Sequence, residues 1–136
     1  MLFRSTSAPV FGMQESGFLT AMARGDRIGV IAISDSSILR HRKYLRRMDV
    51  LDRMVAERPL NMSVADTASG SGTFARLHDV SETLVREDHA DVIVLGCAGL
   101  SAHRSRLEEA INRPVVDPTQ AAVAMALGAI LVQSIR

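Results

Sequence analysis

The sequence predicts an α/β protein of three layers, in which helices cover both faces of a small parallel sheet of about four strands. Two apolar runs, 27–34 (RIGVIAIS) and 90–96 (ADVIVLG), are typical of strands buried on both faces. Stretches with helical spacing follow them, and strands that alternate with helices imply a parallel sheet. A chain of 136 residues fits one such domain.

The first half of the chain is expected to hold two helices around the first buried strand. A helix is expected over 15–24, ended by Gly25, and the preceding stretch 8–11 could be a short strand. After the strand, a long amphipathic helix is expected to continue until just before Pro59, because apolar side chains recur at helical spacing. Its candidate N-cap residues are Asp35, Ser36 and Ser37.

The second half repeats the alternation of strand and helix. Residues 60–67 alternate weakly and could form another strand, and residues 68–72 (ASGSG) are expected to form a loop. The remaining elements are expected at 73–88 (helix), 90–96 (strand), 101–111 (helix), 114–117 (strand) and from Pro118 to near the end (helix).

The last helix is unusually apolar. Residues 121–132 include no charged side chain. A helix that is apolar on most faces needs cover on most faces, and one small sheet covers only one of them. We therefore expect a second domain or a second subunit on this helix, and a homo-oligomer is the expected assembly.

Composition excludes several classes of protein. Lys and Arg (16) nearly balance Asp and Glu (15), so no nucleic-acid partner is expected. A single cysteine excludes an internal disulfide framework and fits a reducing, cytoplasmic setting. No apolar run is long enough for a membrane span, and the N-terminus does not resemble a signal peptide.

The N-terminal residues 1–5 (MLFRS) belong to no periodic pattern. They match the translation of a common sequencing adapter, so the natural reading frame could begin upstream of Met1. The alternative is an ordinary frayed terminus, and the sequence leaves both open.

The lone cysteine lies where a buried strand ends. Ligands of open parallel sheets gather at the carboxyl ends of the strands, which here are 34–37, 97–99 and 117–119. Cys97 also precedes a helix, whose N-terminal amides favour a thiolate. The alternative is a small buried hydrophobic residue, which is the commonest fate of a free cysteine.

Other polar residues give weaker signals. His41, His78, His89 and His103 lack metal-ligand spacing, so no metal site is expected, and surface or packing roles are favoured. The basic stretch 40–47 is expected to be a solvated helix face. Residues 69–72 lack the lysine of a phosphate-binding loop. Glu15 is expected to be a surface position on its helix.

Two stretches together resemble the aspartate/glutamate/hydantoin racemase superfamily, and its hydantoin and allantoin racemases in particular. They are ADVIVLGCAGL (90–100) and RPVVDPTQAAVAMALGAI (113–130). Residues 9–34 are also similar to the entry of that family into its second lobe. The resemblance implies two α/β lobes with the site between them, one cysteine from each lobe, and no metal or cofactor. This chain would then be the second lobe alone, over 1–136.

The resemblance implies roles for particular residues. Cys97 would be one of two acid/base groups acting on a small-molecule substrate. The substrate would be bound by Gly96, Ala98 and Gly99 at the cysteine turn, and by Ala32, Ile33 and Ser34 after the first clear strand. Racemisation needs acid/base groups on opposite faces of the substrate, so a chain with one cysteine is expected to be inactive or nearly so alone.

This sequence departs from the family at several positions. Gly99 stands where glutamate racemases carry a histidine, which argues against glutamate as substrate. Ala32 and Ile33 stand where threonines are common, which leaves the substrate open. Arylmalonate decarboxylases work with one cysteine at the position of Cys97, so a lyase is an alternative. A non-catalytic domain that binds a small carboxylate is another.

Overall fold

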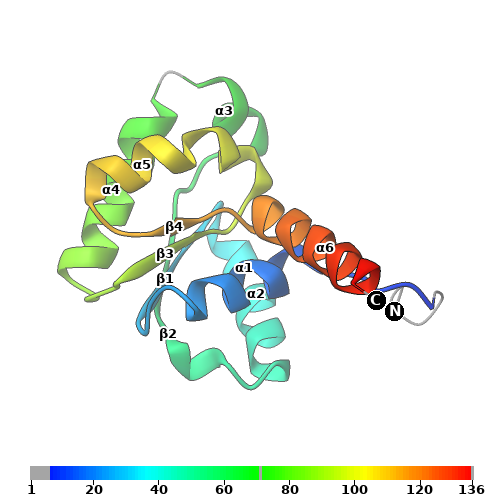
Figure 1. Cartoon of the computed structure of the whole chain (residues 1–136). Coiled ribbons are helices and arrows are strands. Elements are labelled where there is room, and N and C mark those ends of the chain that lie inside the picture. The colour runs from blue at the N-terminus through cyan, green and yellow to red at the C-terminus, as the bar shows by residue number, and fades with distance from the viewer. Residues whose placement is uncertain (1–6, 71, 136) are drawn as a thin grey trace.

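The structure is a computed structural model that describes residues 7–70 and 72–135. Four parallel strands form one sheet in the order β2-β1-β3-β4, which confirms the predicted fold class (Figure 1). The strands are β1 (Ile28–Ala32), β2 (Met54–Pro59), β3 (Val92–Leu95) and β4 (Val115–Val116). Residues 1–5, for which the sequence raised a question, lie outside the described residues.

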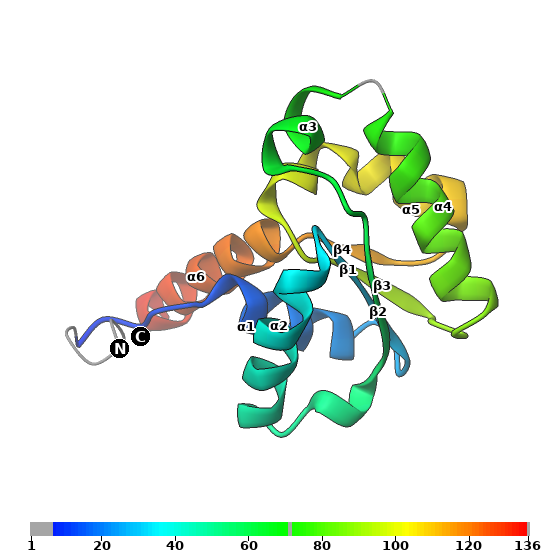
Figure 2. The ribbon, with the colours of Figure 1, turned by 180° about the vertical axis from the view of Figure 1, so that it is seen from behind.

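Helices cover both faces of the sheet (Figures 1 and 2). Helix α1 (Met13–Met22), helix α2 (Asp35–Arg47) and the start of α6 (Pro118–Ser134) pack on one face. Helices α4 (Thr73–Arg86) and α5 (Arg104–Ile111) pack on the other. The short helix α3 (Val64–Ser69) and the 3-10 turn η3 (Ala98–His103) contact each other beyond the carboxyl ends of the strands, while the 3-10 turn η2 (Leu51–Arg53) leads into β2.

Alternation along each strand divides the core into two parts. In β3, Val92 and Val94 face α1 and α2, whereas Ile93 and Leu95 face α4 and α5. All four of these side chains are buried. A strand covered on both faces must be apolar at every position, which is why β1 and β3 were recognisable in the sequence.

The long helix expected up to Pro59 is wrong in its second half. Helix α2 ends at Arg47, and Asp49 takes a left-handed conformation with φ 58° that a helix cannot continue through. Strand β2 then occupies Met54–Pro59 at the edge of the sheet. The N-cap of α2 is Ser34, one residue before the predicted candidates.

Two further expectations are also wrong. Residues 60–67 form no strand: Asn61 has φ 54°, and α3 begins at Val64 with the Ser63 hydroxyl accepting from the Asp66 amide. This helix includes the first residues of the expected loop at 68–72. Residues 8–11 are irregular and form no strand.

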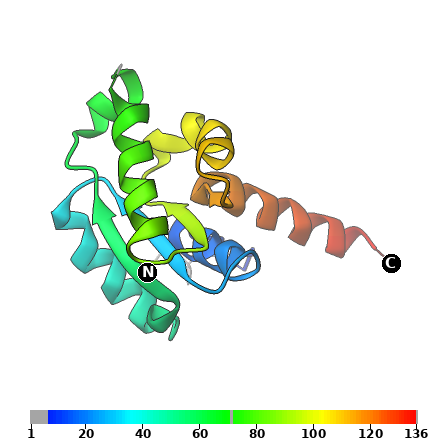
Figure 3. The same ribbon diagram turned by 90° about the vertical axis from the view of Figure 1, so that its left-hand side faces the viewer.

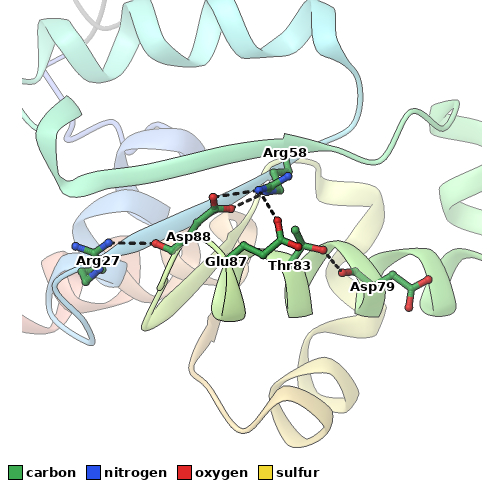
Figure 4. Close-up of polar contacts among 6 residues, drawn as sticks. All are labelled: Arg27, Arg58, Asp79, Thr83, Glu87 and Asp88. Carbon is green, nitrogen blue, oxygen red and sulfur yellow. Dashed lines mark hydrogen bonds and ion pairs between the residues drawn. The ribbon is translucent and has the colours of Figure 1, made fainter.

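An arginine network joins the edge strand to the end of α4 (Figure 4). Arg58 on β2 donates to both carboxylate oxygens of Asp88, at 2.6 and 3.1 Å, and to Glu87 at 3.3 Å. The hydrogen bond with Asp88 raises the pKa of Arg58, so the guanidinium stays charged. Arg27, just before β1, donates to the Asp88 carbonyl oxygen. The network therefore fixes the crossover from β2 to β3.

Helix α6 extends away from the rest of the chain (Figure 3). Its first turns pack on α1, but its later apolar side chains are exposed, including Leu127 (56%), Ile130 (60%) and Leu131 (66%). The described residues therefore leave the later turns of this helix uncovered. Over the described ranges no helix is both long and apolar enough to span a membrane.

Candidate functional site

The turn that carries Cys97 is fastened to the neighbouring strand. The Gly96 amide donates a 2.7 Å hydrogen bond to the Ile31 carbonyl at the end of β1. A Cβ at Gly96 would collide with that same carbonyl oxygen, so only glycine fits this close approach. Cys97 follows in extended conformation (φ −145°, ψ 133°) and is the N-cap of η3. The sequence predicted this position at the end of a strand correctly.

The Cys97 side chain is half-buried and packs against the core on the α4 and α5 side of the sheet. A Cβ at Gly99 would lie 3.6 Å from the Cys97 sulfur and 3.0 Å from the Thr67 hydroxyl oxygen. A side chain at Gly99 would therefore crowd Thr67, and the glycine lets helix α3 approach the cysteine turn closely. Sequence reasoning missed Thr67, although the pattern Ser63-x-x-Asp66 is typical of a helix start and could have placed it.

The amides after the cysteine are free donors. Among the described residues, none accepts a hydrogen bond from the N–H of Ala98 or Gly99, whereas the Leu100 N–H donates to the Cys97 carbonyl at 3.1 Å. The first N–H groups of any helix lack partners within it. Two such donors beside a thiol are suited to a developing negative charge on a substrate oxygen.

The residues expected at the end of β1 lie at the same edge of the sheet, but most of their polar groups are already bonded. The carbonyl oxygens of Ala32 and Ile33 accept from the amides of Leu60 and Met62 at 2.8 and 3.3 Å. Ala32 is fully buried, so its methyl group is closed to a ligand. The Ser34 hydroxyl is bonded to two serines in the first turn of α2. Their predicted role in binding a substrate stays a prediction.

At the end of β4, Asp117 caps the N-terminus of helix α6. Asp117 is buried, and its carboxylate accepts from the amides of Thr119 and Gln120 at 3.2 and 3.3 Å. It starts α6 and holds Pro118 against Gly17 of α1, where a Cβ would lie 2.9 Å from the proline ring. This carboxylate therefore acts in the structure of the lobe.

Glu15 is partly exposed on α1, and its carboxylate accepts a 3.2 Å hydrogen bond from the Tyr44 hydroxyl on α2. Burial of the phenol raises the pKa of Tyr44, and the nearby Glu15 charge and hydrogen bond raise it further. Tyr44 thus remains a neutral donor that orients Glu15.

A buried hydrogen bond joins α2 to the edge strand. His41 Nδ1 lies 2.5 Å from the Glu57 carboxylate, and the two side chains are 11% and 0% exposed. The second Glu57 oxygen is buried without a hydrogen-bond partner. The sequence indicated a surface or packing role for His41, and the structure gives it a packing role with a charged partner that sequence reasoning missed.

The other histidines do not converge on a site. His103 and His78 flank the Phe74 ring, with centroid distances of 6.1 and 6.3 Å, and His89 is exposed in a turn. Within 7–70 and 72–135, no group of three or more His, Cys, Asp or Glu side chains is arranged to hold a metal ion.

A partly open pocket of about 210 Å³ lies on the α1 and α2 side of the sheet. Gly96 and Ala98 contribute to its wall, but Cys97 between them does not. The pocket therefore reaches the cysteine turn without being lined by Cys97 itself. The pocket is lined by Met13, Gln14, Phe18, Val30, Arg40, His41, Leu45, Val94, Leu95, Gly96, Ala98, Pro118 and Thr119.

The model of the family described as Asp/Glu/Hydantoin racemase matches residues 1–126. A hydantoin racemase from Rhizobium meliloti is 31% identical over 130 residues, which cover 87% of this chain and 49% of the relative. A hydantoin racemase from Paenarthrobacter aurescens is 28% identical over 126 residues, which cover 89% of this chain and 52% of the relative.

Solved structures of similar proteins share the fold of this chain. An allantoin racemase from Pseudomonas fluorescens has a TM-score of 0.89 and 26% identity, over 94% of this chain and 55% of that one. An arylmalonate decarboxylase shares the fold, with a TM-score of 0.71 and 21% identity. The match covers 93% of this chain and 56% of the decarboxylase. The chain spans about half the length of the curated relatives that it matches.

Proposed function

Since the chain belongs to the Asp/Glu/hydantoin racemase family, we propose that it is one lobe of a cofactor-independent racemase or epimerase. Its substrate would be an amino-acid derivative such as a hydantoin or allantoin. The observation that carries this proposal is the placement of Cys97 at the end of β3, beside the two free amides of Ala98 and Gly99.

The chemistry follows from that placement. The Cys97 thiolate removes the α-proton of the substrate, and the electron pair moves onto the adjacent carbonyl oxygen. The N–H groups of Ala98 and Gly99 stabilise that oxygen in the enolate. A second acid then returns a proton to the opposite face. In the reverse direction Cys97 donates the proton.

The second acid/base group is proposed to come from another lobe, because Cys97 is the only cysteine among the 136 residues. The chain by itself is then expected to have little or no racemase activity. The exposed apolar side chains of α6 support a second protein surface there, and we propose that the isolated chain self-associates through them. The single cysteine and balanced charge support a cytoplasmic protein with no nucleic-acid or membrane partner.

Exchange of the substrate α-proton in deuterated water tests the proposal. Exchange is followed by proton NMR on a 5-substituted hydantoin, with the chain alone and with a hydantoin racemase first lobe fused before it. We expect exchange from the fused protein and its loss in the Cys97→Ser variant. Unchanged exchange in that variant would refute the role of Cys97, and Ser101→Ala is the control for a nearby side chain.

A single-cysteine lyase is the second candidate, favoured by the presence of one cysteine and by the fold shared with arylmalonate decarboxylase. It is distinguished by release of carbon dioxide from an arylmalonate. A non-catalytic carboxylate-binding domain is distinguished by a Cys97 thiol that iodoacetamide alkylates no faster than it alkylates a free thiol in water.

A further inference from the structure

We propose that the pocket between α1 and α2 is a second ligand site, which takes a small carboxylate with an apolar body and holds it through Arg40 and His41. The pocket has a volume of about 210 Å³, and apolar side chains such as Phe18 and Leu45 line it. A cavity of about 150 Å³ holds a benzene ring, so this pocket accommodates a ring with a short polar substituent.

Arg40 supplies an unpaired positive charge at this pocket. Arg40 is an exposed residue that lies on the pocket wall, and no hydrogen bond or ion pair joins its guanidinium to another described residue. Arg42, Arg46 and Arg47 on the same helix also have no carboxylate partner among the described residues, but they do not line the pocket. A free guanidinium beside apolar walls favours a ligand that carries its own carboxylate, since the two planar groups can form two parallel hydrogen bonds.

His41 supplies an oriented second donor. Glu57 accepts from Nδ1 and so fixes the proton on that nitrogen and the plane of the ring. The other ring nitrogen, Nε2, has no partner among the described residues, and the ring lines the pocket. Nε2 donates to a bound carboxylate when the ring carries a proton on both nitrogens.

This pocket adjoins the proposed substrate site but is not lined by Cys97. The Cys97 side chain packs with the core on the α4 and α5 face, whereas the pocket lies on the α1 and α2 face. Gly96 and Ala98 line the pocket and also belong to the turn that carries the thiol. A ligand in the pocket would therefore contact that turn from the α1 and α2 side of the sheet.

Benzoate is the probe, and its binding to the 136-residue chain is measured by calorimetry and by amide NMR shifts. We expect one site, with shifts at Gly96 and His41. Arg40→Gln should weaken binding by about ten- to a hundredfold, since a hydrogen bond to a charged group contributes about 1.5–3 kcal/mol. Arg42→Gln removes the same charge from an exposed position on the same helix and should change affinity less than about twofold.

Two further measurements separate this proposal from the proposed function. Benzamide, which has the same ring but no charge, should bind at least about tenfold more weakly and should be insensitive to Arg40→Gln. Alkylation of Cys97 should leave benzoate binding unchanged. Absence of binding, equal losses in the Arg40 and Arg42 variants, or loss on alkylation would each overturn the second site, and none of these results bears on proton exchange at Cys97.

Discussion

The amide nitrogen of Gly96 lies 2.7 Å from the carbonyl oxygen of Ile31, and this hydrogen bond fastens the cysteine turn to the end of β1. The contact leaves no room for a side chain at residue 96. The position of the Cys97 thiol thus depends on a backbone contact between two strands that lie far apart in the sequence.

The first prediction concerns this contact. Gly96→Ala forces the Cβ against the Ile31 carbonyl, and should lower the free energy of unfolding by about 1–3 kcal/mol or more in urea denaturation. Gly128→Ala is the control, because no atom lies within 4 Å of its Cβ position in helix α6. That change should raise stability by about 0.5–1 kcal/mol through helix propensity. Similar effects of the two substitutions would contradict the close approach at Gly96.

The second prediction concerns the buried pair of His41 and Glu57. His41→Leu leaves the Glu57 carboxylate buried without a partner and should cost about 3–5 kcal/mol of unfolding free energy. The double variant, with leucine at both positions, should be more stable than His41→Leu alone, because no charge is then left buried. Thermal and urea unfolding of both variants measure the difference.

The exposed pair of Arg86 and Glu82 on α4 is the control for that experiment. Glu82→Ala should change stability by less than about 1 kcal/mol, as exposed ion pairs contribute little. A single variant at His41 as stable as the double variant would show that Glu57 is not held as a carboxylate.

The third prediction concerns alkaline pH. Burial, together with Glu15, raises the pKa of Tyr44 in the folded state above its ordinary value of 10.0. The folded protein then holds the phenolic proton more tightly than the unfolded chain does. The resulting stability is fully present below about pH 10 and is lost as pH rises through the folded-state pKa.

Tyr44 is the only tyrosine in the chain, so the ultraviolet absorbance of phenolate reports its titration directly. The midpoint should lie above that of the urea-unfolded protein, and Glu15→Gln should move it downward. Tyr44→Phe should flatten the loss of stability above pH 10. A midpoint equal to that of the unfolded chain would argue against the Tyr44–Glu15 contact.

The fourth prediction concerns helix α6. If the isolated chain self-associates through this helix, glutamate at both Leu127 and Leu131 should shift sedimentation toward the monomer without loss of helical circular dichroism. Leu39→Glu is the control, because Leu39 is 78% exposed but lies on α2. A wild-type chain that stays monomeric up to millimolar concentration would remove the proposed self-association.

Much of the fold could be predicted because the central strands are buried on both faces. Strand β2 could not be predicted, because an edge strand can carry polar residues and proline, which here are Glu57, Arg58 and Pro59. The apolar residues of β2 also continued the helical spacing of α2. Asp49 ends the helical stretch between α2 and β2 with a left-handed conformation. Glycine is the usual residue in that conformation, so an aspartate gave no signal of a helix end.

The prediction of one continuous helix also concealed the contact between His41 and Glu57. In one continuous helix, His41 and Glu57 would lie about 24 Å apart, at 1.5 Å for each of 16 residues, so no contact between them could be expected. The place of Cys97 at a strand end followed from local sequence. The face of the sheet on which the thiol lies could not be predicted, because it depends on how helix α3 and the turn after Leu95 pack.

The strand order has a consequence for synthesis on the ribosome. β1 lies between β2 and β3, and Ile28 pairs with both Met54 and Val92. β2 emerges soon after β1 and can pair with it, but the other edge of this fully apolar strand must wait for the rest of α4 and β3. Until then it presents unpaired backbone groups that a second nascent chain could bind. Aggregation during translation is therefore the main hazard of this topology, and a chaperone that shields β1 should increase the yield of folded protein.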